Sequence, residues 1–452
     1  MQQGIGWGLS RWGHALLGAL VALASLVEAQ SVGAAPRCSR EEQNNVCIDA
    51  NPNCPATPGP FGIAAGSWPV YQQNVQHTGQ SPFNGPTCSN LVWETKLKGQ
   101  VLSALALAPG NTGEPETLFV PVGKAPICAV DPNTGAELWC KTNEIGKRPD
   151  RSAPVIGNGS YAFIGTRDND MWAINVPPLG SSSATVAWRQ KVCTDGDITV
   201  PPIIGNDGLI YMASDSLSAG TLIAMCPGPV RQPKWCLNPV GGGIRNASPA
   251  LSPSGNVLYV VIGGGALGAF DPQTGAELWR VQLEPKRSIG RNENLAPVVH
   301  PTTGQIYVGL RKGLYVVNPP VSPGGQPTST LLFAIPKGYR MAPPALDVPR
   351  NTIVFGVSKG LKNTIYAIGL NGAVKWQRSD LGRGRFQNNP PVIDASGRIY
   401  LALRRTLIAL DVNGGDLWRR DVQGQLNGSP ILAAGRLYVG TTAGRVYAIG
   451  GC

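Results

Sequence analysis

The sequence predicts an all-β protein, an eight-bladed β-propeller of four-stranded blades, and three observations support this. Glycine (58) and proline (40) together make up 98 of 452 residues, which suits many short strands joined by tight turns. The hydrophobic share of 42% is enough for a core, and the charged share of 14% excludes a coiled coil. A strand–turn–strand unit that ends in tryptophan recurs along the chain.

The first 29 residues have the features of a secretory signal peptide. Arg11 precedes the apolar run Ala15–Val27, which is short for a membrane span. Cleavage is expected after Val27-Glu28-Ala29 or after Gly33-Ala34-Ala35. The next cysteine, Cys38, follows a proline–arginine pair where lipidation requires a small residue. We therefore expect export to the periplasm or exterior of a Gram-negative-type bacterium, without a lipid anchor or a membrane span.

Residues 30–87 form an arm that is rich in proline, asparagine and cysteine. Cys38, Cys47 and Cys54 are spaced as in a small disulfide-stapled loop. The arm is expected to act as a tethered lid or spacer, or else as a docking element for a partner. An N-terminal cysteine is expected to tie it to the propeller at Cys193.

The propeller is expected over residues 88–452, and its repeat is clearest in two nearly identical segments. Ala129–Trp139 and Ala269–Trp279 share the pattern Ala-x-Asp-Pro-x-Thr-Gly-Ala-Glu-Leu-Trp, and Ala367–Trp376 and Ala409–Trp418 repeat it with one residue fewer. Eight closing aromatics are spaced 42 to 54 residues apart, as in four-stranded blades. They are Trp93, Trp139, Trp188, Trp235, Trp279, Phe333 (by position only), Trp376 and Trp418.

The two ends of the propeller are expected to share one blade. The last unit, residues 426–452, has three strands and no closing tryptophan, and the strand around Trp93 has no unit before it. If this strand is outermost and Trp93 lies opposite Ala448, no open sheet edge separates the first and last blades. Cys452 then lies beside Cys88, which predicts a disulfide that clasps the ring.

The same register argument concerns four other cysteines. It sets Cys128 opposite Cys140 and brings Cys226 near Cys236, so that both pairs are candidates for bridges within a blade. No zinc site is expected, because only His77 and His300 remain beyond the signal and neither has ligand spacing.

The repeat resembles the tryptophan-docking repeat of the pyrroloquinoline quinone (PQQ)-type eight-bladed propellers. In that family the alanine, glycine and tryptophan of the unit lock adjacent blades, here Ala129, Gly135 and Trp139 and their equivalents. The segment from Trp68 to Gly79 also resembles the lead-in of secreted members. The resemblance implies either a quinoprotein dehydrogenase or a cofactor-free binding protein like the outer-membrane assembly factor BamB, since the repeat is structural in both.

One mouth of the central channel is expected to carry asparagine and arginine. Residues shortly before the inner-strand prolines lie near this mouth, and Arg and Asn there suit carboxylates, phosphates or sugars, or else satisfy loop carbonyls and channel waters. The candidate ligand-binding rim consists of Arg151, Arg245, Asn246, Asn294, Arg340, Gln387, Asn388 and Asn427.

A quinone enzyme would need a calcium site and a carboxylate base beside PQQ. Glu293 with Asn294 is the weak candidate for metal ligands, and Asp197 or Glu293 for the base. The vicinal disulfide that covers the quinone in the resembling enzymes is absent from this sequence. We therefore expect no cofactor. The alternative is that the protein binds PQQ and Ca²⁺.

The first hypothesis is an exported, non-catalytic, monomeric binding propeller for a protein, peptide or envelope polymer. Its rivals are a PQQ- and Ca²⁺-dependent dehydrogenase of alcohols or sugars and a BamB-like assembly factor. The net charge of +11 favours solubility and attraction to acidic envelope surfaces. Nucleic acid is not expected as a partner, because no Lys/Arg-rich run or binding motif is present.

Overall fold

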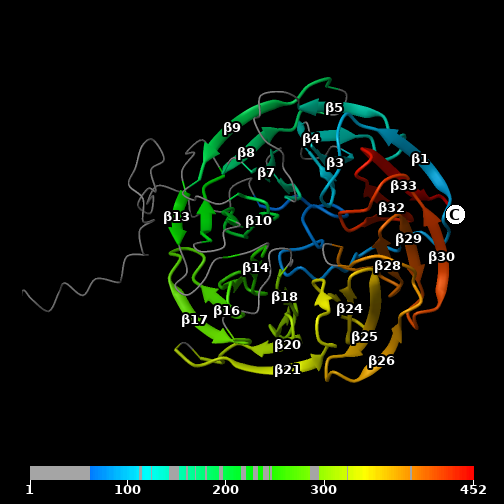
Figure 1. Cartoon of the computed structure of the whole chain (residues 1–452). Helices are drawn as coiled ribbons and strands as arrows, with labels where there is room; N and C mark the ends of the chain where they lie inside the picture. Colours follow the sequence, from blue (N-terminus) through cyan, green and yellow to red (C-terminus); the bar gives the residue numbers. More distant parts are fainter. Residues whose placement is uncertain are drawn as a thin grey trace, which may run out of the picture.

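The computed structural model describes most of the chain beyond residue 61. The described residues are 62–110, 115–123, 125–141, 152–158, 161–167, 169–178, 181–192, 197–214, 220–227, 233–237, 244, 247–285, 295–322, 324–386 and 389–452. They form eight antiparallel sheets arranged as a propeller (Figure 1). Within them there is no helix, and therefore none that could cross a membrane. The predicted fold class is confirmed. The signal peptide and the cysteines of the arm lie outside the described residues.

The first four blades follow one another along the chain, each with its first strand innermost (Figure 1). Blade 1 contains β2 (Ala106–Pro109), β3 (Glu116–Val122), β4 (Ala125–Val130) and β5 (Glu137–Lys141). Blade 2 contains β6 (Val155–Gly157), β7 (Tyr161–Gly165), β8 (Asp170–Asn175) and β9 (Thr185–Lys191). Blade 3 contains β10 (Ile203–Ile204), β11 (Ile210–Ala213), β12 (Leu222–Met225) and β13 (Pro233–Leu237). Blade 4 contains β14 (Ala250–Leu251), β15 (Leu258–Ile262), β16 (Ala266–Phe270) and β17 (Glu277–Gln282).

The other four blades complete the ring, and the last one contains both ends of the propeller. Blade 5 contains β18 (Val298–Val299), β19 (Ile306–Gly309), β20 (Gly313–Asn318) and β21 (Thr328–Ala334). Blade 6 contains β22 (Arg340–Met341), β23 (Ala345–Asp347), β24 (Thr352–Lys359), β25 (Lys362–Gly369) and β26 (Val374–Arg378), with β22 and β23 both paired to β24. Blade 7 contains β27 (Val392–Ile393), β28 (Ile399–Leu403), β29 (Thr406–Leu410) and β30 (Asp416–Asp421). Blade 8 contains β31 (Ile431–Ala433), β32 (Arg436–Gly440), β33 (Arg445–Gly450) and, outermost, β1 (Leu91–Lys96).

Most blades are held by a row of three residues across their second, third and fourth strands. The predicted tryptophan–alanine register is present in seven blades, including Trp93 opposite Ala448 and Trp139 opposite Ala129. In six of these blades an aromatic residue of the second strand lies on the other side of the alanine. Because alanine is small, the two rings meet above it, with centroids 5.8 to 6.4 Å apart.

Neighbouring blades are joined where a tryptophan packs on the turn of the next blade. Trp235 of blade 3 donates from Nε1 to the Pro272 carbonyl of blade 4 at 2.9 Å. A Cβ at Gly275 in that turn would lie 2.9 Å from the Trp235 ring, and this glycine has a φ of +73°. Only glycine suits both the close approach and the left-handed backbone. Trp93 and Trp376 pack in the same way on Gly135 and Gly414.

Phe333 joins blades 5 and 6 by a different contact. It lies opposite Leu314, whereas Thr330 lies opposite Val316, the blade 5 counterpart of the alanines. The Phe333 ring packs against Phe355 and Tyr366 of blade 6, with centroids 5.5 and 5.0 Å apart. An aromatic cluster therefore replaces the tryptophan–glycine stack at this boundary.

The ring closes by the disulfide that the sequence predicts. Cys88 and Cys452 are bonded, with a Cα–Cα distance of 6.1 Å and a sequence separation of 364. Trp418 Nε1 and Tyr400 Oη of blade 7 both donate to the Pro86 carbonyl at 3.1 Å. Pro132 in blade 1 is the matching acceptor for Trp93 and Tyr438. The segment before β1 thus takes the place of the turn that blade 8 lacks.

The other predicted disulfides differ in outcome. Cys128 and Cys140 lie opposite each other and are bonded, with a sequence separation of 12. Cys226 and Cys236 are both disulfide-bonded cysteines. However, the register that sets Trp235 opposite Ala224 also sets Cys236 opposite Ile223, three residues before Cys226. Residues three apart along a strand are about 10 Å apart, so this register does not support the expected bridge between the two.

Candidate functional site

The two ends of the propeller ring differ in the loops that they carry. One end carries the turns between the first and second and between the third and fourth strands of each blade; we call it the docking face, because Gly135, Gly275 and Gly414 lie in its turns. The other end carries the turns between the second and third strands and the loops that lead to the next blade. We call it the basic face. Hydrogen bonds such as Ile335 N to Lys312 O and Gly384 N to Leu361 O join its loops to its turns.

A lead-in segment, residues 62–87, runs inside the ring and is drawn in blue in Figure 1. Its residues hydrogen-bond to the first strands or first turns of seven blades, all except blade 3. The contacts are Ile63 with Gly157, Trp68 with Leu107, Val75 with Leu251, Gln76 with Val299, Thr78 with Leu346, Ser81 with Ile393, and Asn84 with Gly435. The segment therefore ties the blades together around the axis.

Two lead-in side chains fill the axis itself. Tyr71 is buried in a cluster with Ala104, Ala153 and Ala296, one from each of the segments that enter blades 1, 2 and 5. The His77 ring packs edge-on against Tyr71 at 5.5 Å. Small alanines on three sides leave room for an aromatic plug, which the composition of the inner strands alone did not reveal.

His77 is held neutral in this plug. Its side chain is fully buried, and this burial lowers the pKa of the imidazole to about 4, although Nδ1 contacts the Pro297 carbonyl at 3.2 Å. Among the described residues, neither His77 Nε2 nor Gln72 Oε1 has a hydrogen-bond partner. Gln72, Gln73 and His77 all have positive φ, at 51°, 77° and 58°. The axis thus combines backbone strain with two buried, unsatisfied polar atoms, a combination that occurs at functional sites.

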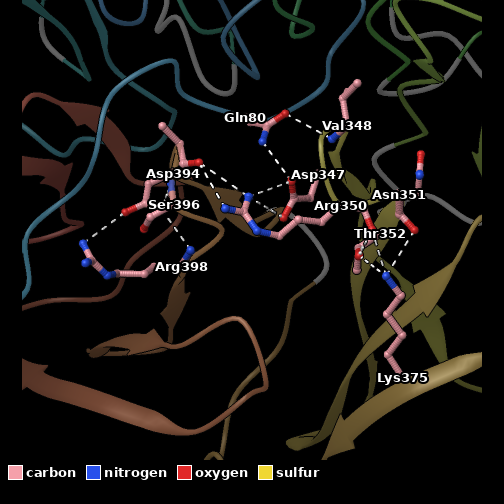
Figure 2. Close-up of polar contacts among 11 residues, drawn as sticks. Gln80, Asp347, Val348, Arg350, Asn351, Thr352, Lys375, Asp394, Ser396 and Arg398 are labelled. Atoms are coloured by element: carbon pink, nitrogen blue, oxygen red, sulfur yellow. Dashed lines mark hydrogen bonds and ion pairs between the residues drawn. The ribbon is translucent and has the colours of Figure 1, made fainter.

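Two buried carboxylates hold the lead-in segment against blades 6 and 7 (Figure 2). Gln80 donates from Nε2 to Asp347 Oδ1 at 3.1 Å and accepts from the Val348 amide at 3.2 Å. Asp394 accepts from the Gly85 amide at 3.0 Å and lies 3.6 Å from Arg398. Arg350 pairs with Asp347. Every carboxylate in this network has charged or amide donors around it, so the network is structural.

The described members of the predicted rim lie on the basic face. Arg340 is half-buried in β22 beside Ser358. Asn427 is half-buried next to Leu426, whose amide donates to the Arg404 carbonyl. Asp197 is half-buried next to Ile198, whose amide donates to the Thr166 carbonyl. The structure places these three at one end of the ring. Arg151, Arg245, Asn246, Glu293, Asn294, Gln387 and Asn388 lie outside the described residues.

The calcium-assisted quinone site that the sequence left open depends mostly on residues outside the described part of the chain. No three His, Cys, Asp or Glu side chains among them come together as a metal site requires. The expected calcium ligands Glu293 and Asn294 are outside that part of the chain, and Asp197 is the one described candidate base. No reaction step is therefore derived through PQQ.

Comparisons with known proteins agree with the fold. No curated protein is matched by the sequence. A quinohemoprotein alcohol dehydrogenase from Comamonas testosteroni superposes with a TM-score of 0.64 at 13% identity, covering 85% of this chain and 80% of the other. BamB from Moraxella catarrhalis superposes with a TM-score of 0.56 at 16% identity, covering 80% and 100%. A europium-containing methanol dehydrogenase gives 0.63 at 14%, covering 85% and 98%. At these identities the similarity shows the fold alone.

The sequence itself carries a more specific match. The family model described as outer membrane protein assembly factor BamB matches residues 123–318 and 361–451, which is more than half of the chain. Those residues include the repeat units with Ala129, Ala269 and Ala409 and their tryptophans. The chain therefore belongs to this family of PQQ-like repeat propellers.

Proposed function

We propose that this chain is an exported, periplasmic binding propeller that holds an envelope component on its basic face without catalysing a reaction. The observation that carries the proposal is the chemistry of that face. Its described rim residues Arg340 and Asn427 are a cation and an amide, groups that recognise anions and hydrogen-bonding ligands. Membership of the BamB family and the disulfide clasp support a role outside the cytoplasm.

A retention assay tests this proposal against a quinone enzyme. The full chain would be purified with excess PQQ and Ca²⁺, and dye-linked oxidation of alcohols and sugars would be measured. We expect neither stoichiometric quinone nor turnover. Retained quinone with turnover that is lost in Asp197→Asn would overturn the proposal and favour the dehydrogenase.

The BamB-like role is the second candidate, because the family model favours it. It predicts that the chain captures a component of the outer-membrane β-barrel assembly machinery from solubilised envelopes. Capture that survives charge reversal at Arg340 would place the contact elsewhere on the ring. Failure to capture any such component would leave the binding role to another envelope partner.

A further inference from the structure

The basic face carries a dense group of cations over three consecutive blades. The group, which we call the cationic crescent, comprises Arg311, Lys312, Lys337, Arg340, Lys359, Lys362, Arg383, Arg385, Arg404 and Arg405. All but Arg340 are exposed. Three carboxylates lie beside this group. Asp380 pairs with Arg378 at 2.6 Å, Asp421 accepts from Thr406 Oγ1 at 2.6 Å, and Glu284 of the preceding loop accepts from the Lys312 amide at 2.6 Å. The hydrogen bond from the Arg378 guanidinium lowers the pKa of Asp380 to about 2. Ten cations over blades 5 to 7 therefore account for a charge comparable to the net +11 of the whole chain.

Intramolecular ion pairing does not explain six of the ten cations. Lys337, Lys359, Lys362, Arg383, Arg404 and Arg405 form no ion pair within the described part of the chain. On the docking face, by contrast, Arg350, Arg398 and Arg436 each contact a carboxylate or a carbonyl. Like charges without an ion pair repel one another, so these six cations cost stability unless an anionic surface compensates them.

One of the cations is held at an additional conformational cost. Arg404 has a φ of +57° in the turn between β28 and β29. The equivalent turn of blade 6 uses Gly360, with a φ of +63°, where a Cβ would meet nothing within 4 Å. Glycine would satisfy the backbone at Arg404 without strain. Strain kept at an exposed arginine points to a role for its side chain.

An exposed leucine accompanies the charges. Leu361 lies between Lys359 and Lys362 at the tip of the blade 6 turn and is 43% exposed. It is the one large apolar side chain with such exposure in the crescent loops as described. Protein interfaces bury an apolar core depleted of lysine, which the crescent lacks. A leucine flanked by lysines instead suits a lipid interface, where the apolar tip enters and the ammonium groups remain among the head groups.

We propose that the cationic crescent binds the surface of membranes that contain anionic phospholipid. The cations would contact lipid phosphates over blades 5 to 7, and Leu361 would insert at the head-group boundary. This goes beyond the proposed binding role, because it orients the whole ring with its docking face away from the membrane. Binding by several exposed charges is screened by salt, so it should weaken steeply as the ionic strength rises.

Cosedimentation of the full chain with lipid vesicles tests the proposal. Vesicles with phosphatidylglycerol would be compared with vesicles of phosphatidylcholine alone, at low and at high salt. We expect binding to the anionic vesicles only, and its loss at high salt. Equal binding to both vesicle types, or no binding to either at low salt, would overturn the proposal.

Three variants locate the contact. Lys359→Ser with Lys362→Ser should lower anionic-vesicle binding by about fivefold for each cation removed. The control pair, Lys98→Ser with Lys191→Ser, removes equal charge from exposed positions on the same face but outside blades 5 to 7. It should change binding less than twofold, because the proposed contact is confined to those three blades. Equal losses in the two pairs would refute a contact made by the crescent.

Leu361→Ser distinguishes a membrane from a free polyanion. It should weaken binding to vesicles severalfold and leave binding to heparin unchanged, since only the membrane takes up an apolar side chain. Retention on heparin without cosedimentation would mean that the crescent binds a soluble polyanion, and the membrane proposal would then be wrong. Circular dichroism of each variant verifies that the propeller remains folded.

Discussion

The docking face and the basic face lie at opposite ends of the same strands and differ in what their loops do. The loops of the first join the blades, and the loops of the second carry exposed charge. On the docking face, tryptophans pack on glycine turns, the lead-in segment bonds to seven blades, and a disulfide joins the chain ends. On the basic face, exposed cations lie on the turns and loops of blades 5 to 7, and Arg404 has a positive φ. The comparison shows that the stabilising contacts between blades and the exposed cations lie at opposite ends of the ring axis. Substitutions on the docking face should therefore change stability, and substitutions in the crescent should change binding.

The largest effect is expected at the ring clasp. Replacing Cys88 and Cys452 by Ala opens a loop of 364 residues and should cost about 6 kcal/mol from chain entropy. The matched control replaces Cys128 and Cys140 and should cost about 3 kcal/mol, because its loop spans only 12 residues. Both are measured by denaturant unfolding without reductant. Equal losses would show that the clasp constrains the unfolded chain no more than a local bridge does.

The next effect is expected at a docking tryptophan. Trp235→Ala should cost about 3–5 kcal/mol, because the ring is fully buried and its Nε1 bonds to the next blade. Trp376→Ala removes a half-buried ring with the same contact and should cost less. Denaturant midpoints give both values. If Trp376 proved the more costly, burial would not be what sets the strength of these contacts.

A pH effect is expected from the axial plug. Since burial lowers the pKa of His77 to about 4, the unfolded chain binds the proton first as the pH falls below about 6.5. The native state should therefore lose roughly 3 kcal/mol relative to a His77→Asn variant between pH 7 and pH 4. Asparagine is the chosen control because it tolerates the positive φ. Parallel stability profiles for the two proteins would mean that His77 titrates normally.

The smallest effect is expected on the basic face, where the substitution should stabilise the protein instead of destabilising it. Arg404→Gly should raise the free energy of unfolding by roughly 1 kcal/mol, because it relieves the left-handed backbone and one repulsive charge. The mirror substitution Gly360→Arg should lower it by a similar amount. Thermal unfolding measures both. A loss of stability in Arg404→Gly would show that the arginine supports the fold.

Much of the fold could be predicted because the repeat carries it. The alanine and tryptophan of each unit must lie opposite each other, so the register, the ring closure and the Cys88–Cys452 pair follow from the spacing. The predicted pairing of Cys226 with Cys236 was not supported, because the register that sets Trp235 opposite Ala224 places Cys236 opposite Ile223, three residues from Cys226. Phe333 was assigned by position, and only the packing against Phe355 shows how it replaces a tryptophan.

The candidate site was less predictable, because it depends on which loops share an end of the ring. The rim prediction chose Arg340 and Asn427 by counting back from inner-strand prolines. Both lie at one end of the ring, and their role in binding a ligand stays a prediction. The rim prediction did not include the cationic crescent, because Lys359 and Arg404 lie in turns far apart in the sequence. Successive turns of a blade lie at opposite ends of the ring, so assigning every second turn to the same end would have brought Lys359 and Arg404 together. No sequence signal placed Tyr71 and His77 on the axis.

The path of the lead-in segment has a consequence for how the protein is made. This segment leaves the ribosome before any blade, yet its partners extend from Leu107 to Gly435. Cys88 likewise precedes its partner by 364 residues. Such long sequence separations make these contacts the slowest to form. Each blade can fold on arrival, but the ring can be sealed only after the final strand has been delivered. A chain that loses its last residues would therefore keep its blades and lose its closure.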